Sequence, residues 1–383
     1  MLEQRAAEIA TGLFKEYYRG MARLESAYVV GREFGIGNFD SKVAYRHIAF
    51  GSPDELHRYL AELGPAFVSC SAARYTNAAA RPMEAKGWMG SDLIFDLDAS
   101  DLRLECAAAH GSGWVCGNCL ESIRHETFRL IDEFLIPDFG FSVREISINF
   151  SGNRGYHVHV VNDDVVRLDG AARRGITDYI TANGLDAEMF FNGLKARGRR
   201  LEGPMPTDYG WRGRFARGVI AALNKGEGAL VELGIEKRVA RRLAANSAEA
   251  VLGIATNGNW DKVNVPKKAE VWSSVLQRLA IRQADSIDRN VSNDIYHLIR
   301  LPETLHGDTA LIAKRMTYAE LEHFDPMSSA VAFSGGGMLK VKTGRVPSFS
   351  MKGETFGPYN GEVMELPICA ALYLLLKRVA SPA

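Results

Sequence analysis

Two aspartates stand two residues apart in an otherwise apolar stretch, DLIFDLDASD. Successive side chains of a strand point to opposite faces, so Asp96 and Asp98 share one face. Two neighbouring carboxylates on a half-buried strand repel each other, and the loss of hydration adds to that cost. The pair is tolerable where the strand end opens onto water, or where a cation lies between the carboxylates. Carboxylate oxygens suit Mg²⁺ or Mn²⁺, and two carboxylates can bridge two ions about 3.5–4 Å apart.

A second group of polar residues lies in NFSGNRGYHVHV, where a short turn separates two predicted strands. The small residues of this turn, among them Ser151, leave room for a polyphosphate to approach the backbone. Arg154 has the planar fork of donors that binds phosphate oxygens. His157 and His159 lie two residues apart, so they point to the same face. The alternative interpretation is a hairpin with one surface arginine and one histidine satisfied within the fold.

A third group lies in DSIDRNVSNDIYHLIRLPETLHGDTAL. Asp288 precedes a predicted short helix, for which Asn290 or Ser292 is the expected cap. Arg300, in a strand-like segment, and His306, in the loop that follows, would bring further donors to the same place. The alternative is a capping aspartate and an ordinary arginine at the rim of the fold.

The third kind of chemistry is a metal centre of soft ligands. Cys106, His110, Cys116 and Cys119 lie within fourteen positions, and thiolate and imidazole at such spacing suit tetrahedral Zn²⁺. Because the protein fills all four ligand positions, the site would be structural rather than catalytic. The alternative is a loop with unrelated thiols and a surface histidine.

The bulk composition limits the class of protein. A chain of 383 residues can form one large core or two ordinary ones, and 46% apolar with 24% charged residues is typical of a globular protein. The formal net charge is zero, so a polyanion site must come from a local cluster. We expect neither a signal peptide nor a membrane span, because no apolar run approaches about 20 residues. Five cysteines, three of them close together, lead us to expect a reducing cytoplasm.

Hydrophobic periodicity predicts the elements that must position these residues. Residues 1–30 are expected to form a helix. SPDELHRYLAELG predicts a helix that is capped by Ser52 and ends at Gly64. Strands are expected in AFVSCSAARY, SDLIFDLDAS, DIYHLIRLPETLHG and MLKVKTGRV, with a hairpin formed by REISINFSG and RGYHVHVV. ICAALYLLLKRVA predicts a buried helix near the end of the chain.

From about residue 165 to 285 the sequence changes to helical periodicity with charged faces. We therefore predict an α/β (α+β) fold in which residues 1–165 and 286–383 form a core of mixed sheets flanked by helices. A zinc-binding loop at 105–120 lies within this core, and residues 166–285 form a mainly helical insert. The insert contains the basic stretches KARGRR and GWRGRFARG, for which a solvated helical face is the plainer interpretation.

Taken in order, these motifs resemble those of the small catalytic subunit of archaeal and eukaryotic DNA primase, the archaeal form most closely. The resemblance is carried by REFGIGNF, KGWMGSDLIFDLDASDL, the Cys/His loop, FSGNRGYHVHV, GWRGRF and IRLPETLHGDTAL. It implies a catalytic Mg²⁺ or Mn²⁺ site formed by Asp96, Asp98 and Asp288. It assigns nucleotide binding to Ser151, Arg154, His157, Arg300 and His306. It assigns structural Zn²⁺ to Cys106, His110, Cys116 and Cys119.

The resemblance also implies an activity and its partners. We expect DNA-templated synthesis of short RNA primers from NTPs by two-metal nucleotidyl transfer. The resemblance leaves open whether the enzyme also makes DNA primers. The partners would be single-stranded DNA and a large primase subunit in a heterodimer. Three alternatives remain: an end-joining polymerase of the same superfamily, a metal-dependent phosphohydrolase or nuclease, and a zinc-stabilised, non-catalytic nucleic-acid-binding subunit.

Overall fold

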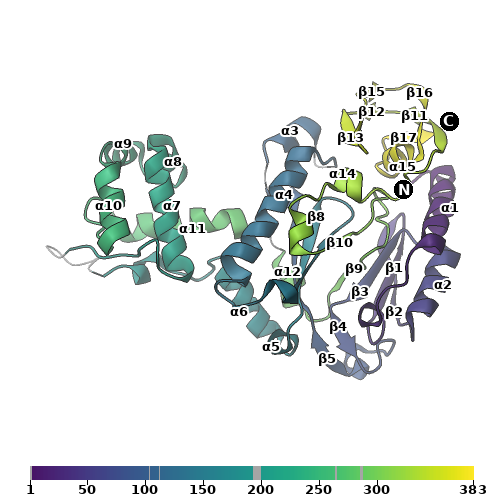
Figure 1. The fold of residues 1–383 in the computed structure, drawn as a ribbon, viewed down its shortest axis with the longest axis horizontal. Coiled ribbons are helices and arrows are strands. Elements are labelled where there is room, and N and C mark those ends of the chain that lie inside the picture. Colours follow the sequence, from purple (N-terminus) through teal and green to yellow (C-terminus); the bar gives the residue numbers. More distant parts are fainter. Residues whose placement is uncertain (1, 103, 112, 193–199, 264, 285–287) are drawn as a thin grey trace. The chain divides into compact units, whose positions relative to one another are not determined.

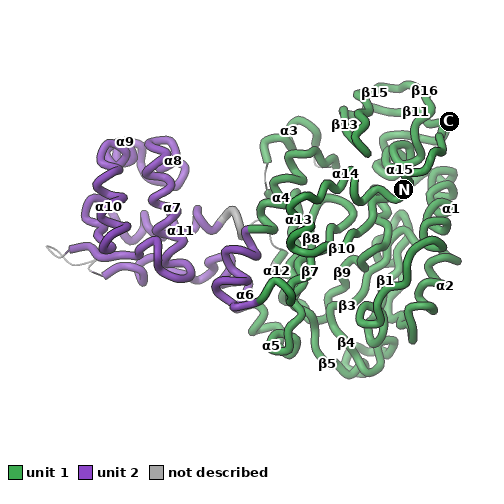
Figure 2. Tube along the Cα trace, viewed as in Figure 1, with its two compact units in different colours: residues 1–128, 142–174, 286–383 green, residues 129–141, 175–285 purple. Residues whose placement is uncertain are grey.

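The computed structural model describes residues 2–102, 104–111, 113–192, 200–263, 265–284 and 288–383. The chain divides into two compact units (Figures 1 and 2). Unit 1 consists of residues 1–128, 142–174 and 286–383, and unit 2 consists of residues 129–141 and 175–285. The predicted mixed α/β fold class is confirmed. The predicted boundaries between core and insert stay a prediction.

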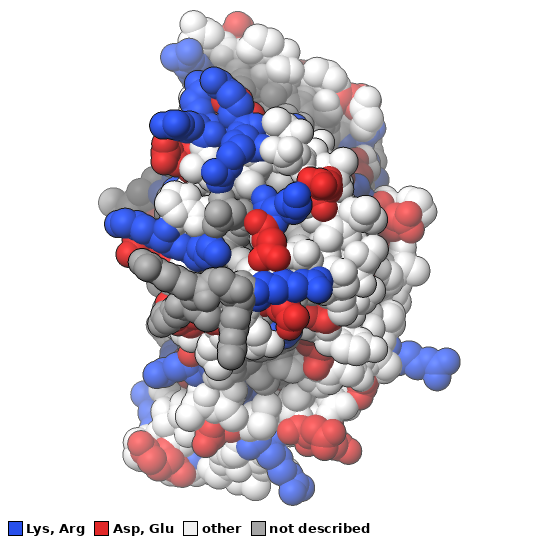
Figure 3. Space-filling view, turned by 90° about the vertical axis from the view of Figure 1, so that its left-hand side faces the viewer, with Lys and Arg blue, Asp and Glu red and all other residues white. Residues whose placement is uncertain are grey.

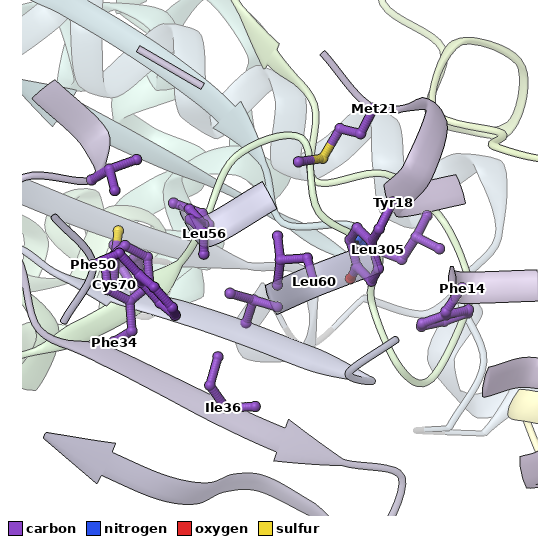
Figure 4. Packing of buried hydrophobic residues seen from close by; sticks show 14 of the residues in the cluster. Phe14, Tyr18, Met21, Phe34, Ile36, Phe50, Leu56, Leu60, Cys70 and Leu305 are labelled. Atoms are coloured by element: carbon purple, nitrogen blue, oxygen red, sulfur yellow. Dashed lines mark hydrogen bonds between the residues drawn. The ribbon is translucent and has the colours of Figure 1, made fainter. Parts of the chain in front are cut away.

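The first sheet of unit 1 has the strand order β2-β1-β3-β9, with every pair antiparallel. Its strands are β1 (Phe34–Asn38), β2 (Ser41–Ile48), β3 (Phe67–Ser71) and β9 (Leu298–Arg300). The helices α1 (Gln4–Gly20) and α2 (Pro53–Leu63) pack their apolar faces into the same core. Figure 4 shows Phe14 and Tyr18 of α1, Leu56 and Leu60 of α2, and Phe34 and Ile36 of β1 in this core.

The predicted ends of α2 are confirmed. The Ser52 hydroxyl accepts a hydrogen bond from the Glu55 N–H at 3.2 Å, and Pro53 occupies the first helical position. Gly64 ends the helix with φ +61°, a left-handed conformation that glycine adopts at low cost.

The expected helix over residues 1–30 is wrong in its second half. Helix α1 ends at Gly20, and Met21 is extended with ψ 137°. A short 3₁₀ turn, Ser26–Tyr28, follows instead. Glycine is a poor helix former, which favours the end of the helix at Gly20, and Arg23 beyond it donates to Asp54 at 3.0 Å.

The second sheet of unit 1 has the order β10-β7-β8-β6, again antiparallel throughout. Its strands are β6 (Leu93–Asp98), β7 (Ile146–Phe150), β8 (Gly155–Val160) and β10 (Arg315–Met316). The predicted hairpin is therefore present as β7 and β8. On β6, Leu93, Phe95 and Leu97 are fully buried, whereas Asp96 and Asp98 on the other face stay partly exposed.

Short elements complete unit 1. The Cys/His loop contains α3 (Cys106–His110) and leads into α4 (Gly117–Leu130). The other helices are α5 (Asp163–Val166), α12 (Arg289–Asn293), α13 (Tyr318–Leu321), α14 (Pro326–Ser329) and the buried α15 (Ile368–Leu376). The other strands are β4 (Ala73–Tyr75), β5 (Trp88–Ser91), β11 (Met338–Thr343), β12 (Arg345–Val346), β13 (Phe349–Met351), β14 (Glu354–Phe356), β15 (Tyr359–Asn360), β16 (Val363–Pro367) and β17 (Ala380–Pro382).

Unit 2 is helical in its described residues. Its helices are most of α6 (Gly170–Ile180), α7 (Gly210–Lys225), α8 (Glu227–Glu232), α9 (Lys237–Ala245), α10 (Ser247–Asn257) and α11 (Lys268–Ala284). Four aromatic residues pack together in its core: Phe191, Phe215, Trp260 and Trp272. The basic stretch KARGRR, apart from Arg200, lies outside the described residues.

The surface agrees with the balanced composition. Figure 3 shows basic and acidic side chains interspersed over the face that it presents, in keeping with a net charge of zero. Among the described helices, none combines the length and apolar character needed to cross a bilayer.

Replacing Leu60 by Ala should destabilise unit 1, because its side chain is fully buried in the core. Such truncations typically cost about 2–5 kcal/mol of unfolding free energy. Leu63→Ala on the same helix is the matched control, since Leu63 is 50% exposed. Urea unfolding followed by circular dichroism measures both variants. Equal unfolding midpoints would contradict the assignment of Leu60 to the core.

Candidate functional site

The three candidate aspartates converge through backbone contacts. The N–H of Asp288 donates to the carbonyl of Asp96 at 2.9 Å, and the Ser292 hydroxyl donates to the carbonyl of Ile94 at 2.7 Å. These two bonds attach α12 to β6. The expected cap of α12 is wrong: Asp288 itself caps the helix, because its carboxylate accepts from the Asn290 N–H at 2.8 Å. Residues more than 190 positions apart thus meet at one strand end.

The charges of this cluster are poorly compensated. Burial, and after it the charges of Asp98, Asp288 and Asp101, raise the pKa of Asp96 to about 7. Burial and the charge of Asp98 also raise the pKa of Asp101. A divalent cation would remove the repulsion that raises these values, and carboxylate oxygens are the ligands that Mg²⁺ and Mn²⁺ prefer. The donor set therefore fits such an ion.

The turn between β7 and β8 presents its arginine to the same cluster. The Ser151 hydroxyl accepts from the N–H groups of Asn153 at 3.3 Å and Gly155 at 3.2 Å, which closes the turn. Arg154 Nε then lies 2.7 Å from Oδ1 of Asp98. Both side chains are about one-third exposed, so the pair lies at the surface of the site.

Gly152 lets this turn approach the loop that carries His306. Its φ is +81°, and a Cβ added there would lie 2.8 Å from Cβ of His306. Only glycine fits both the conformation and the space. The turn and the His306 loop are consequently in direct contact.

His157 lies beside Asp96 in a neutral form. The register pairs Asp96 with His157 and His157 with Asn149, so the three side chains share one face of the sheet. His157 Nε2 lies 3.5 Å from Oδ1 of Asp96. Burial first, then the charges of His159 and Arg300, keep the pKa of His157 well below its ordinary value. The imidazole can therefore donate or accept a hydrogen bond without adding charge.

Arg300 and His306 both contact the ring of Phe67. The Arg300 guanidinium lies 4.9 Å from the Phe67 ring centroid, and the His306 ring packs edge-on against the same ring at 5.2 Å. Burial lowers the pKa of Arg300 to about 10, although the group stays cationic at neutral pH.

Two lysines that the sequence motifs do not indicate belong to this group. Burial, then the charges of Arg300, Lys42, Lys377 and Arg154, keep the pKa of His306 well below its ordinary value. Four cations from four separate segments thus act on one histidine. Lys42 lies on the exposed strand β2 and carries no sequence signal, whereas Lys377 and Arg378 together end an apolar run.

The Cys/His loop gathers its four predicted ligands. Their ligand atoms all lie within 4.8 Å of one another. The Sγ atom of Cys119 is 3.4 Å from that of Cys106, 3.7 Å from that of Cys116 and 3.3 Å from Nε2 of His110. Zn–S bonds of about 2.3 Å in a tetrahedron separate two sulfurs by about 3.8 Å, so the cluster is close to that size.

A second contact orients the histidine of this cluster. Nδ1 of His110 lies 2.9 Å from the carbonyl of Gly111. A proton on Nδ1 would be donated to that carbonyl, which leaves the lone pair of Nε2 directed at the thiols. The cluster can therefore hold a metal ion.

Comparisons with known proteins agree on one family. The family model described as DNA primase small subunit matches residues 95–318. The DNA primase small subunit PriS of Methanothrix thermoacetophila is 35% identical over 402 residues, which cover 99% of both chains. The protein of the same name from Methanococcoides burtonii is 34% identical over 385 residues, 96% of both chains. The one from Thermoplasma acidophilum is 34% identical over 320 residues, 83% of both chains.

Replacing Asp96 by Asn should stabilise the protein at pH 8 in buffer without added divalent cations. The folded-state pKa of about 7 lies above the ordinary 3.8. Ionisation of Asp96 therefore destabilises the folded protein as the pH rises from about 4 through 7. With 29% of the side chain exposed, we expect a gain of about 1–3 kcal/mol in unfolding free energy at pH 8 and little at pH 4.

Urea titrations at the two pH values measure this difference. Glu365→Gln, on the exposed part of β16, is the control for loss of one carboxylate. If Asp96→Asn and wild type have the same stability at pH 8, the carboxylates do not repel one another as their positions require.

Proposed function

Because the chain belongs to the family of DNA primase small subunits, we propose that it is the catalytic subunit of a DNA primase. Membership supports a nucleotidyltransferase-type enzyme. The proposed reaction is the joining of NTPs into short RNA primers on a DNA template. The observation that carries the proposal is the backbone contact of Asp288 with Asp96, because it brings the third aspartate to the strand that carries the other two, and its charge contributes to the raised pKa of Asp96.

The three aspartates would hold the catalytic metal ions. Bound by Asp96, Asp98 and Asp288, one or two Mg²⁺ or Mn²⁺ ions would activate a hydroxyl nucleophile and neutralise a triphosphate. Strand β6 supplies two of the carboxylates in a fixed register, and the cap of α12 fixes the third. The acidic groups would thereby be held in position before any ligand binds.

Donors from three segments would bind the phosphates of the nucleotide. Arg154 and Arg300 would supply positive charge, and neutral His157 and His306 would supply hydrogen bonds. Ser151 closes the turn that presents Arg154, so we assign it a positioning role as well as nucleotide contact. None of these groups needs to form a covalent intermediate with the substrate.

The Cys/His cluster would hold one structural Zn²⁺. With Cys106, His110, Cys116 and Cys119 all engaged, no open position remains for substrate. The ion would fix α3, a five-residue helix without buried residues, to the start of α4.

The partners are proposed from the family. The chain would work with a large primase subunit in a heterodimer and with single-stranded DNA as template. A replication enzyme of this family would work in the cytoplasm. Cys70 and Cys369 are not members of the metal cluster, and we assign them no role.

Asp288→Asn should abolish primer synthesis without unfolding the protein. Asparagine caps a helix as well as aspartate, so the exchange removes the charge and keeps α12 in place. We expect the rate of primer formation from NTPs on single-stranded DNA to fall about a hundredfold or more. Asp325→Asn, which makes the same exchange at the cap of α14, is the control and should keep wild-type activity.

Other results would exclude the proposal. Full activity of Asp288→Asn would show that the Asp288 carboxylate takes no part in the reaction. Extension of a supplied primer without synthesis from NTPs alone would favour an end-joining polymerase. Release of nucleotides from DNA without chain growth would indicate a nuclease.

Removal of one thiol should release the zinc. We expect the full chain to contain one zinc per molecule, and Cys119→Ala to contain much less because one of four ligands is lost. Cys369→Ala is the control, since Cys369 lies outside the cluster. Mass spectrometry of the metal content measures all three proteins. Unchanged zinc in Cys119→Ala would exclude this site.

A further inference from the structure

Lys377 makes an unusual set of contacts for a lysine. It directly follows α15, whose last residues are buried in the core, and its side chain is partly buried. Nζ donates to Oδ1 of Asn153 at 3.2 Å and to the carbonyl of Gly113 at 3.3 Å. The ammonium therefore joins the turn that carries Arg154 to the loop that carries the metal cluster.

The positive charge of Lys377 has no counter-ion at close range. Within the described part of the chain, no carboxylate oxygen lies within 4.0 Å of Nζ. Its two oxygen partners are neutral, and the Tyr373 ring centroid lies 5.7 Å away. An ammonium has three N–H donors, so one donor and the whole charge are left for another acceptor.

The surroundings of Lys377 are those of an anion site. Burial, and the charge of Arg154, lower the pKa of Lys377 to about 8, while the charge of Asp308 opposes this shift. The turn that Lys377 contacts is also the turn that touches His306 through Gly152. A partly buried cation is retained at a cost, and a ligand with several negative charges would offset that cost.

We propose that Lys377 binds a phosphate of the incoming nucleoside triphosphate, together with Arg154 and the His306 loop. The proposal rests on the proposed function, because it deepens the same nucleotide site. It adds a substrate-binding residue near the end of the chain, beyond the segment 95–318 that the family model matches. The contact with Asn153 directs the ammonium to the turn, and the contact with Gly113 holds it there.

The test compares equilibrium binding of nucleotides by full-length variants. Lys377→Met removes the charge and keeps the length of the side chain. Its dissociation constant for GTP should rise about ten- to hundredfold, as expected for loss of a charge-assisted hydrogen bond. Binding of guanosine should change little. Lys340→Met is the control, since Lys340 is an exposed lysine on β11 of the same unit.

A cation introduced at Asn153, the contact partner of Lys377, distinguishes a role of Lys377 in phosphate binding from a purely structural role. Asn153 touches Nζ of Lys377, so Asn153→Arg in the Lys377→Met background brings a guanidinium to the same place. This double variant should recover most of the lost affinity for GTP. Lys377→Arg should remain within about threefold of wild type. Zinc content, measured on each variant, reports whether the loop at Gly113 stays folded.

Three results would overturn the inference. The first is wild-type affinity for GTP in Lys377→Met. The second is recovery of GTP affinity when Asp308→Asn is added to Lys377→Met, which would mean that Lys377 only balances the charge of Asp308. The third is failure of Asn153→Arg to restore binding while zinc is retained. If wild type itself binds no nucleotide and makes no primers, the proposed function fails together with this inference.

Discussion

Mutual repulsion of three carboxylates is the constraint on which the site depends. A strand buried on one face places Asp96 and Asp98 side by side, and a backbone hydrogen bond brings Asp288 to the same end. Proteins rarely gather such charges unless another ligand relieves them. The raised pKa of Asp96 expresses this cost directly. A bound divalent cation would relieve this cost.

The cations near the cluster come from segments that are far apart in the sequence and are brought together by the fold. Arg154 lies in a hairpin turn, Arg300 on a strand of the other sheet, and Lys377 after the last helix. Gly152 permits the close approach of the hairpin turn to the His306 loop, because any side chain there would meet that loop. In the proposed site, these cations would lie beside the three carboxylates, as binding of a metal-bound polyphosphate would require.

Local signals in the sequence predict much of this arrangement. The alternation in DLIFDLD, the hairpin around Ser151 and the cap at Ser52 are all decided by neighbours within a few residues. The spacing of the Cys/His ligands likewise depends on a short loop. Family resemblance adds the order of the motifs, which local patterns alone do not provide.

Long-range contacts explain what the sequence leaves out. Ser292 was an expected cap, but its hydroxyl bonds to β6, about 200 positions away, and Asp288 caps the helix instead. Lys42 and Lys377 belong to no motif. Only tertiary packing brings their charges close enough to lower the pKa of His306. Arg23, beyond the end of the first helix at Gly20, pairs with Asp54 of another element. Periodicity contains no information on such contacts.

The most direct test of the central claim is the position of Mn²⁺ in crystals of the full chain, located by its anomalous scattering. The account predicts Mn²⁺ bound jointly by the carboxylates of Asp96, Asp98 and Asp288. Manganese bound elsewhere, or bound by the β6 pair with the Asp288 carboxylate turned away, would contradict it.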